Sequence, residues 1–362
     1  MNDQTDRAFG FEGSWREYAP IAFTNLLLTI VTLGVYRFWA TTRTRRYLWS
    51  RTRFIDERLE WTGTGVELLI GFLIVLVLFG IPFLFLNFGM QAMVLRGQAP
   101  LAGVLGLTSF MVIFYLAGVA RMRMLRYRLS RTWWHGIRGG SNDKGWAYGW
   151  SYVWRNIVAW MVIGLLIPWS MTSLWNDRWN AMSFGPHPFR AAAMPGQIFR
   201  RFLLFYLLPF IIFAVMAVLI FAGGGAAMRG GFDPETQAQP GLAFVLAMIL
   251  MVLLIYTIIG FVALAYYAKF FRVAVSSLSL STLDFHFSAR TKDWFKLILG
   301  DIALVVLTLG IGLVFLSYRH WKFFIVHLDA SGEISLSSLT QSSTNAPGQG
   351  EGLADAFDIG AI

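Results

Sequence analysis

Long apolar segments recur along this chain and limit its fold more than any other feature. Seven are predicted, at roughly 19–39, 66–89, 101–120, 157–175, 202–222, 242–267 and 297–318. A run of about 18 apolar residues is long enough to cross a hydrocarbon core of about 30 Å. Soluble domains carry about 25% charged residues, whereas 14% of these 362 residues are charged and 56% are hydrophobic. The sequence predicts an all-α multi-pass membrane protein with small β elements on its cytoplasmic side.

Residues that could support catalysis or metal binding are scarce in this sequence. It has no cysteine, which excludes disulfides, iron–sulfur ligation, thiol catalysis and thiolate zinc sites. None of its five histidines, at positions 135, 187, 286, 320 and 327, forms an HExxH or HxH motif. The glycines at 223–225 are not followed by the Lys-Ser or Lys-Thr of a phosphate-binding loop. We expect no metal, no cofactor and no catalytic residue, and we predict that the protein is not an enzyme.

Distant parts of the sequence match one another. A shift without gaps places Asn25 on Asp301 and Thr-Leu-Gly at 32–34 on the same tripeptide at 308–310. A weaker match places Asn25 on Asn156 but does not reproduce Thr-Leu-Gly. The prediction is three related units joined by two helix pairs and followed by a disordered tail. In chain order these are the first unit at 1–65, a transmembrane pair at 66–120, the second unit at 121–201, another pair at 202–267, the third unit at 268–336 and the tail at 337–362.

Several motifs in the first two units are specific to one family. They are Phe9-Gly-Phe-Glu-Gly13, the run from Asn25 to Trp39, Arg43, Arg46-Tyr47, Glu60-Trp61-Thr62-Gly63, His135-Gly-Ile-Arg-Gly139 and Trp146-Ala-Tyr148. With these motifs the chain resembles the YjgN-like bacterial inner-membrane proteins, a domain family of unknown function, over roughly residues 9–335. The resemblance implies a multi-pass protein of the bacterial inner membrane. It implies no activity, and residues 337–362 lie outside it.

The distribution of lysine and arginine indicates which loops face the cytoplasm, because basic residues resist translocation. The loops at 90–100 and 223–241 contain one arginine each and are predicted to face outward. The basic loops predicted to be cytoplasmic are 40–65, 121–156, 176–201 and 268–296. Seven alternating spans conflict with this assignment. Either 19–39, 157–175 and 297–318 are re-entrant or interfacial while the other four segments cross, or all seven are spans and the charge bias is weak.

Two groups of polar residues are candidate sites. Asn25, Asn156 and Asp301 occupy matching positions inside apolar segments, where polar groups are costly. They could form an intramembrane cluster that binds a cation or relays protons, or they could simply cap helices. The second group contains the arginines that follow two apolar segments, and these are expected to contact anionic lipid headgroups. These arginines are Arg43, Arg45, Arg46, Arg121, Arg123, Arg126 and Arg128.

Two classes of function remain open at the level of sequence. The first is a non-enzymatic membrane protein that organises lipid or contacts a protein partner, as the basic and aromatic loop residues indicate. The second is a transporter or channel for a small solute or ion, because such proteins use internal repeats and broken helices. We attribute the net charge of +10 to basic residues in cytoplasmic loops that contact anionic lipid headgroups. We expect no nucleic-acid partner.

Overall fold

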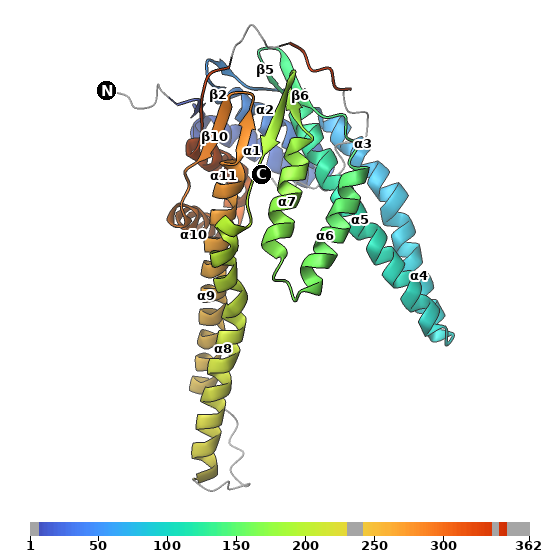
Figure 1. The fold of residues 1–362 in the computed structure, drawn as a ribbon, viewed down its shortest axis with the longest axis vertical. Coiled ribbons are helices and arrows are strands. Elements are labelled where there is room, and N and C mark those ends of the chain that lie inside the picture. Colours follow the sequence, from blue (N-terminus) through green and yellow to red (C-terminus); the bar gives the residue numbers. More distant parts are fainter. Residues whose placement is uncertain (1–6, 230–241, 335–339, 346–362) are drawn as a thin grey trace.

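Four helices dominate the outline of the molecule (Figure 1). The computed structural model describes residues 7–229, 242–334 and 340–345. Within these residues, four helices are long and apolar enough to cross a membrane, namely Gly65–Leu95, Ala99–Arg131, Gly196–Val218 and Met248–Val275. At most 17% of the most apolar stretch of each helix is buried inside the protein. Their side chains are therefore available to surrounding hydrocarbon.

The four long helices are arranged as two pairs that extend from one end of the molecule. In one pair, α3 (Gly65–Val75), a π-helical stretch (Leu76–Gly80) and α4 (Ile81–Leu95) form one rod beside α5 (Ala99–Arg131). The other pair is α8 (Gly196–Arg229) and α9 (Leu242–Val275). The π-helical stretch ends just before Pro82, which has no backbone N–H to donate.

The other three apolar segments each fold back on themselves as a helical hairpin. The hairpins are α1 (Trp15–Val31) with α2 (Arg37–Ser50), α6 (Trp146–Met161) with α7 (Ile167–Asn180), and α10 (Thr291–Leu307) with α11 (Leu316–His327). A short 3-10 helix, η2 (Ile311–Phe315), precedes α11. Because each segment is divided between two short helices, the reading of the chain as seven spanning segments is wrong.

All three hairpins reverse direction at the same kind of residue pair. The pairs are Leu33-Gly34, Ile163-Gly164 and Leu309-Gly310, and both residues of each pair have positive φ. Glycine adopts this conformation without steric cost, whereas the preceding Leu or Ile is strained there. The three leucine or isoleucine side chains at these tips are 74–94% exposed. The middle hairpin thus has the same turn although its sequence reads Val-Ile-Gly instead of Thr-Leu-Gly.

The prediction of an all-α fold is wrong, because a curled antiparallel sheet lies at one end of the long helices. Its eight strands follow the order β11-β10-β9-β8-β7-β6-β5-β4, and β1-β2-β3 form a smaller sheet. The strands are β1 (Phe9–Phe11), β2 (Thr52–Phe54), β3 (Glu57–Arg58), β4 (Glu60–Trp61), β5 (Thr132–Trp134), β6 (Ile137–Gly140), β7 (Ser183–Phe184), β8 (His187–Ala191), β9 (Leu278–Leu280), β10 (Leu283–Phe287) and β11 (Leu328–Ser331).

The two sheets nearly close on each other. At one junction, β3 and β4 are separated only by Leu59. At the other, the backbone N–H of Ala8 donates to Asp329 Oδ1 at 3.0 Å, and the rings of Phe9 and Phe285 lie 6.2 Å apart. Alternate residues of β10 are buried on the inner face, while Asp284 and His286 point outward. The interior of this curled sheet forms part of the largest hydrophobic core.

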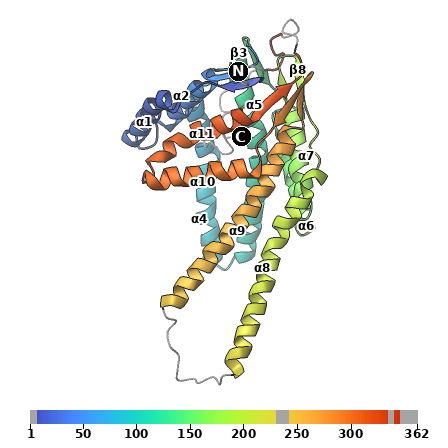
Figure 2. The ribbon, with the colours of Figure 1, turned by 90° about the vertical axis from the view of Figure 1, so that its left-hand side faces the viewer.

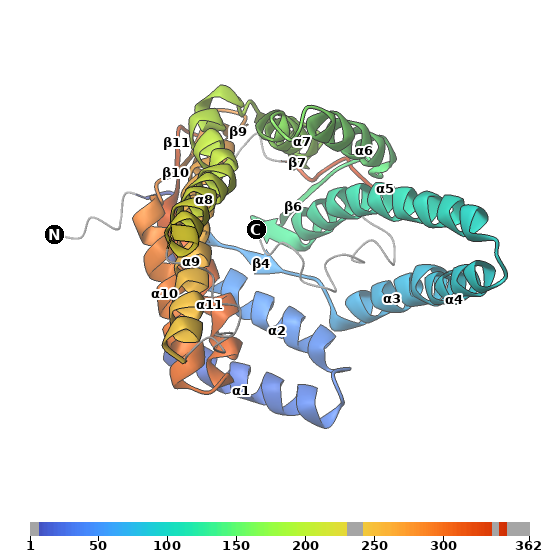
Figure 3. The same cartoon turned by 90° about the horizontal axis from the view of Figure 1, so that it is seen from below.

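The helical hairpins surround the open side of the sheet. Seen from below in Figure 3, the three hairpins and the two long helix pairs lie around a common centre, and hairpin α10/α11 is next to hairpin α1/α2. In Figure 2, α10 and α11 run side by side across the direction of the long helices. The stretch from Phe323 to His327 is the C-terminal part of α11. Only the residues after it, in β11, join the sheet.

Candidate functional site

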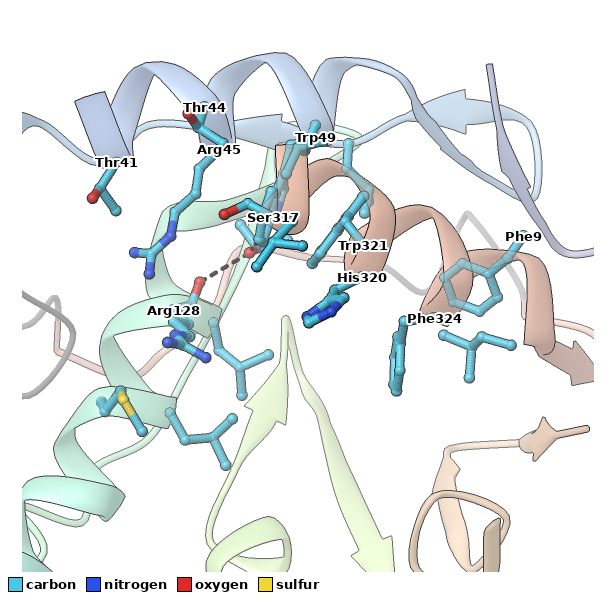
Figure 4. Close-up of a pocket in the computed structure, with 18 of the residues that line it drawn as sticks. Phe9, Thr41, Thr44, Arg45, Trp49, Arg128, Ser317, His320, Trp321 and Phe324 are labelled. Carbon is cyan, nitrogen blue, oxygen red and sulfur yellow. Dashed lines mark hydrogen bonds between the residues drawn. The ribbon is translucent and has the colours of Figure 1, made fainter. Parts of the chain in front are cut away.

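A cavity of about 780 Å³ lies between the sheet and the hairpins. Its wall includes residues from eight strands, namely β1, β2, β5 and β7 to β11, and residues from α1, α2, α5, α7, α9 and α11 (Figure 4). The sheet contributes apolar side chains such as Trp134, Phe184, Phe189 and Phe285. All three hairpins and the ends of two long helices, α5 and α9, therefore meet at this one space, which makes it the candidate site.

The charged part of the wall consists of arginines, which lie beside neutral polar groups such as Asn25 and Thr44. Arg37, Arg45, Arg128, Arg178 and His320 border the cavity, and none of its described lining residues is a carboxylate. Figure 4 shows Arg45 from α2 and Arg128 from α5 reaching into the same space, with His320 from α11 beside them. Guanidinium groups are well suited to bind phosphate or carboxylate. The cavity therefore offers apolar walls together with a set of anion-binding groups.

Arg45 and Arg178 are held within the protein interior. Arg45 is 7% exposed, and its guanidinium lies 5.1 Å from the centre of the Trp61 ring. Arg178 is half-buried and borders the cavity. Burial lowers the pKa of Arg178 below its ordinary value, and the nearby Arg121 and Arg128 lower it further. A buried guanidinium near others of the same charge gains from a bound anion.

Two tryptophans fix the seam between the first and third hairpins on the cavity wall. The rings of Trp49 on α2 and Trp321 on α11 stack with centres 4.0 Å apart. Trp49 Nε1 donates to Thr132 Oγ1 and Trp321 Nε1 donates to Thr52 Oγ1, each at 2.9 Å. Because both indole N–H groups have partners, the stack is well defined in orientation. Helices α2 and α11 thus present their other cavity residues from fixed positions.

Each of the predicted intramembrane polar residues bonds inside its own hairpin. Asn25 Nδ2 donates to the carbonyl oxygen of Ala40 at 3.2 Å and to Thr44 Oγ1 at 3.3 Å. Asn156 Oδ1 accepts from Ser170 Oγ at 3.4 Å. No hydrogen bond among the described residues joins Asn25, Asn156 and Asp301 to one another. Their shared arrangement is a link between the two helices of a hairpin.

Asp301 makes the strongest of these three links. Arg319 Nε lies 2.6 Å from its Oδ1, and His320 Nε2 lies 2.6 Å from its Oδ2. The Asp301 side chain is only 13% exposed, so its charge depends on these two partners. His320 also borders the cavity. Asp301 therefore orients a cavity side chain although it is not itself part of the cavity wall.

The seven arginines predicted to contact lipid lie in different environments. Arg45 and Arg128 border the cavity, whereas Arg43, Arg46 and Arg121 are exposed. Arg121 lies over the Tyr152 ring at 4.6 Å, and Arg123 lies over the Trp146 ring at 4.7 Å. Arg126 is 3% exposed, and its Nη2 donates to the carbonyl oxygen of Asn345 at 3.4 Å. The charge pattern in the sequence did not distinguish the exposed arginines from those that are buried or border the cavity.

The C-terminal residues 340–345 pack against the second unit. Gln341 Oε1 accepts from the backbone N–H of Arg138 at 3.2 Å, and Gln341 Nε2 donates to the carbonyl oxygen of Gly136 at 3.0 Å. Arg138 also donates to the carbonyl oxygen of Thr344. The rest of the segment predicted to be a disordered tail, 337–339 and 346–362, lies outside the described residues, as does 230–241 of the predicted outward loop.

Sequence reasoning missed Arg37, Arg178 and His320 as site residues. In the sequence, Arg178 is one of the basic residues of the loop 176–201. His320 is one of five histidines that form no metal-binding motif. The strands that bring these site residues together are two to five residues long, too short to show an alternating pattern. Within the described residues, no group of three or more His, Asp or Glu side chains is arranged to hold a metal ion.

Comparison with protein families covers nearly the whole chain. Residues 6–356 match the model of the family described as "Bacterial protein of unknown function (DUF898)". The chain belongs to this family. The resemblance predicted from its motifs is thereby confirmed, and the match extends beyond it to include residues 337–356. No solved structure matches the chain.

Curated relatives in this family are inner membrane proteins. The chain is 30% identical to "Inner membrane protein YjgN" of Escherichia coli O157:H7 over 137 residues, which is 38% of this chain and 31% of that protein. It is 25% identical to the protein of the same name from Salmonella typhimurium, over 40% of this chain and 35% of the relative. The chain thus matches about a third of the length of these relatives. With its four long apolar helices, it is a membrane protein.

Proposed function

We propose that this chain is a non-enzymatic protein of the bacterial inner membrane that binds an anionic, lipid-like molecule in the cavity. The observation that carries the proposal is the pairing of a largely apolar wall with four arginines and no carboxylate among the described lining residues. A volume of about 780 Å³ is within the range of small-molecule sites, about 300–1,000 Å³. It is large enough for a headgroup and part of an acyl chain.

The two parts of such a ligand would contact different parts of the wall. The phosphate or carboxylate would lie between Arg45 and Arg128, whose side chains reach the same space (Figure 4). The hydrocarbon part would lie against Phe184, Phe189 and Phe285 of the sheet. Arginine binds such anions with two parallel hydrogen bonds, and apolar contact adds about 25 cal/mol for each Å² removed from water.

The orientation of the chain follows from the same assignment. We infer that the sheet, the cavity and the basic loops 40–65, 121–156, 176–201 and 268–296 face the cytoplasm, in agreement with the positive-inside rule. The cavity would then lie at the level of the inner leaflet. We also infer that the three hairpins are copies of one ancestral unit, because they share the Leu-Gly or Ile-Gly turn and a polar link between their helices.

A transporter or channel for a small solute or ion is the second candidate. What favours it is the contact of Asp301 with His320 in an apolar hairpin, since intramembrane carboxylates and histidines often form ion or proton paths. The lipid-binding function is preferred because the cavity wall is mainly apolar. Reconstitution of the full chain in liposomes with a pH-sensitive dye inside would test the transporter function. A proton flux that disappears in Asp301→Asn would reverse the ranking.

The lipid-binding proposal is tested by identifying what copurifies with the full chain. The protein is purified from native membranes in a mild detergent, and bound lipids are measured by native mass spectrometry. The variant Arg45→Gln/Arg128→Gln should retain about tenfold less anionic lipid, because it loses two charge-assisted contacts. The matched control is Arg43→Gln/Arg46→Gln, which changes exposed residues of the same helix α2. Equal retention in both variants would show that the cavity does not hold the anion.

A further inference from the structure

We propose that a groove on the outer side of the third hairpin is a second binding site, specific for an anionic phospholipid of the surrounding leaflet. The groove has a volume of about 600 Å³ and lies between the start of α1 and helices α10 and α11. It is separate from the cavity and shares no lining residue with it. The proposal does not depend on what the cavity binds.

Helix α11 is the wall between the two spaces. Ser317, His320 and Phe324 are spaced three and four residues apart, as on one face of a helix, and they border the cavity. Arg319, Lys322 and Val326 lie on another face and border the groove. The two sites therefore use different residues of the same helix. A substitution on one face can leave the other site intact.

The groove has a cationic part. Lys322 is exposed and forms no ion pair with a described residue. Arg319 lies beside it on the groove wall and is held by Asp301. The described lining of the groove contains no carboxylate. A phosphate group at Lys322 would therefore meet a positive charge that is not already neutralised, with Arg319 fixed nearby as a second donor.

The rest of the groove is apolar and opens on a face suited to hydrocarbon. Leu297, Leu304 and Phe315 line it. On the same helix α10, Val306 is 64% exposed and Leu307 is 82% exposed. Exposed apolar surface of this kind is stable next to acyl chains, not next to water. A free phosphate ion would leave the apolar part unfilled, whereas a phospholipid supplies both a phosphate and a chain.

The test uses the full chain in lipid nanodiscs that contain a photoactivatable phosphatidylglycerol with a diazirine in its acyl chain. After illumination, the labelled residues are mapped by mass spectrometry. We expect labelling at residues that line the groove and not the cavity, such as Leu297, Leu304 and Val326. Lys322→Gln should lower this labelling about fivefold, since one basic residue contributes about 1 kcal/mol at a membrane surface. Lys322→Arg should restore it, and Arg128→Gln on the cavity side should leave it unchanged.

The source of the phosphate is decided by competition. Unlabelled phosphatidylglycerol should compete with the probe, whereas phosphatidylcholine and free inorganic phosphate should not. The proposal is overturned if Lys322→Gln labels as strongly as the unchanged protein, or if a phosphatidylcholine probe labels the groove equally. Competition by inorganic phosphate alone would mean that the groove binds a soluble anion and not a lipid.

Discussion

The first and third hairpins have the same architecture but connect their two helices by different chemistry. Both turn at a Leu-Gly pair with nearly equal φ values, 50° and 91° in the first and 49° and 93° in the third. In the first hairpin, Asn25 donates to Ala40 and Thr44 across the helices. In the third, Asp301 forms ion pairs with Arg319 and His320 at matching depth in the hairpin.

The difference shows that the position of the link is fixed by the hairpin, while its charge is set by the surroundings. An amide bonds to a carbonyl or hydroxyl without an ionised partner, so Asn25 does not require a nearby cation. A carboxylate as little exposed as Asp301 needs compensating cations. The third hairpin supplies them at adjacent positions of α11, one facing the groove and the other facing the cavity.

The largest difference in stability between the two hairpins should be the one between the variants Asp301→Ala and Asn25→Ala. Removal of Asp301 leaves Arg319 and His320 without their partner, and we expect a loss of about 2 kcal/mol, reduced from the value for fully buried pairs because both side chains are partly exposed. Removal of Asn25 should cost about 1 kcal/mol, the value of its hydrogen bonds. The measurement is thermal unfolding of the full chain in detergent. Equal losses in the two variants would mean that the ion pairs add nothing beyond a neutral link.

Alanine in place of the turn glycine should lower the stability of the protein by the same amount in the first and in the third hairpin. At Gly34 and at Gly310, no atom lies within 4 Å of an added Cβ, so alanine there introduces only backbone strain. The expected loss for Gly34→Ala and for Gly310→Ala is about 1 kcal/mol each. Gly89→Ala in α4 is the control, because that site is equally open but has no positive φ, and alanine in a helix is favourable. A large loss at only one of the two turns would show that the hairpins are not equivalent.

The sequence predicted those parts of the molecule that depend on local pattern. The apolar segments at 66–89, 101–120, 202–222 and 242–267, which one of the two interpretations of the sequence takes as the crossing segments, coincide with the four candidate spans. The matching positions of Asn25, Asn156 and Asp301 identified residues that occupy the same place in each hairpin. Local pattern also marks strand β10, because Leu283 to Phe287 alternates between apolar and polar residues.

The curled sheet and the cavity could not be predicted in this way, because they depend on contacts between distant residues. Strands β3, β4 and β7 have two residues each, which is too few for any periodicity. The cavity joins Arg45 to Arg128 and His320, which come from three separate parts of the chain. A basic loop residue looks the same in sequence whether it points to lipid, as an exposed Arg43 can, or into an enclosed space.

The smallest effect should appear at Tyr47, whose counterpart in the third hairpin by sequence match is Phe323. Tyr47 Oη donates to the carbonyl oxygen of Ser14 at 2.9 Å. Burial, together with the charge of Glu17, raises the pKa of Tyr47 to about 12 from 10.0. The folded protein thus favours the neutral phenol. We expect Tyr47→Phe to cost about 0.5 kcal/mol at pH 8, the value of a single hydrogen bond to a neutral group.

The pH dependence of this difference distinguishes the hydroxyl from simple packing. A pKa that is higher in the folded state gives stability that is complete below pH 10 and is lost as the pH rises towards 12. The unfolding midpoints of the original protein and of Tyr47→Phe should therefore converge above pH 10 and then cross as the pH rises towards 12. Phe323→Leu should show no such convergence relative to the original protein. A constant difference between Tyr47→Phe and the original protein across this range would mean that the phenol group ionises equally in the folded and unfolded states.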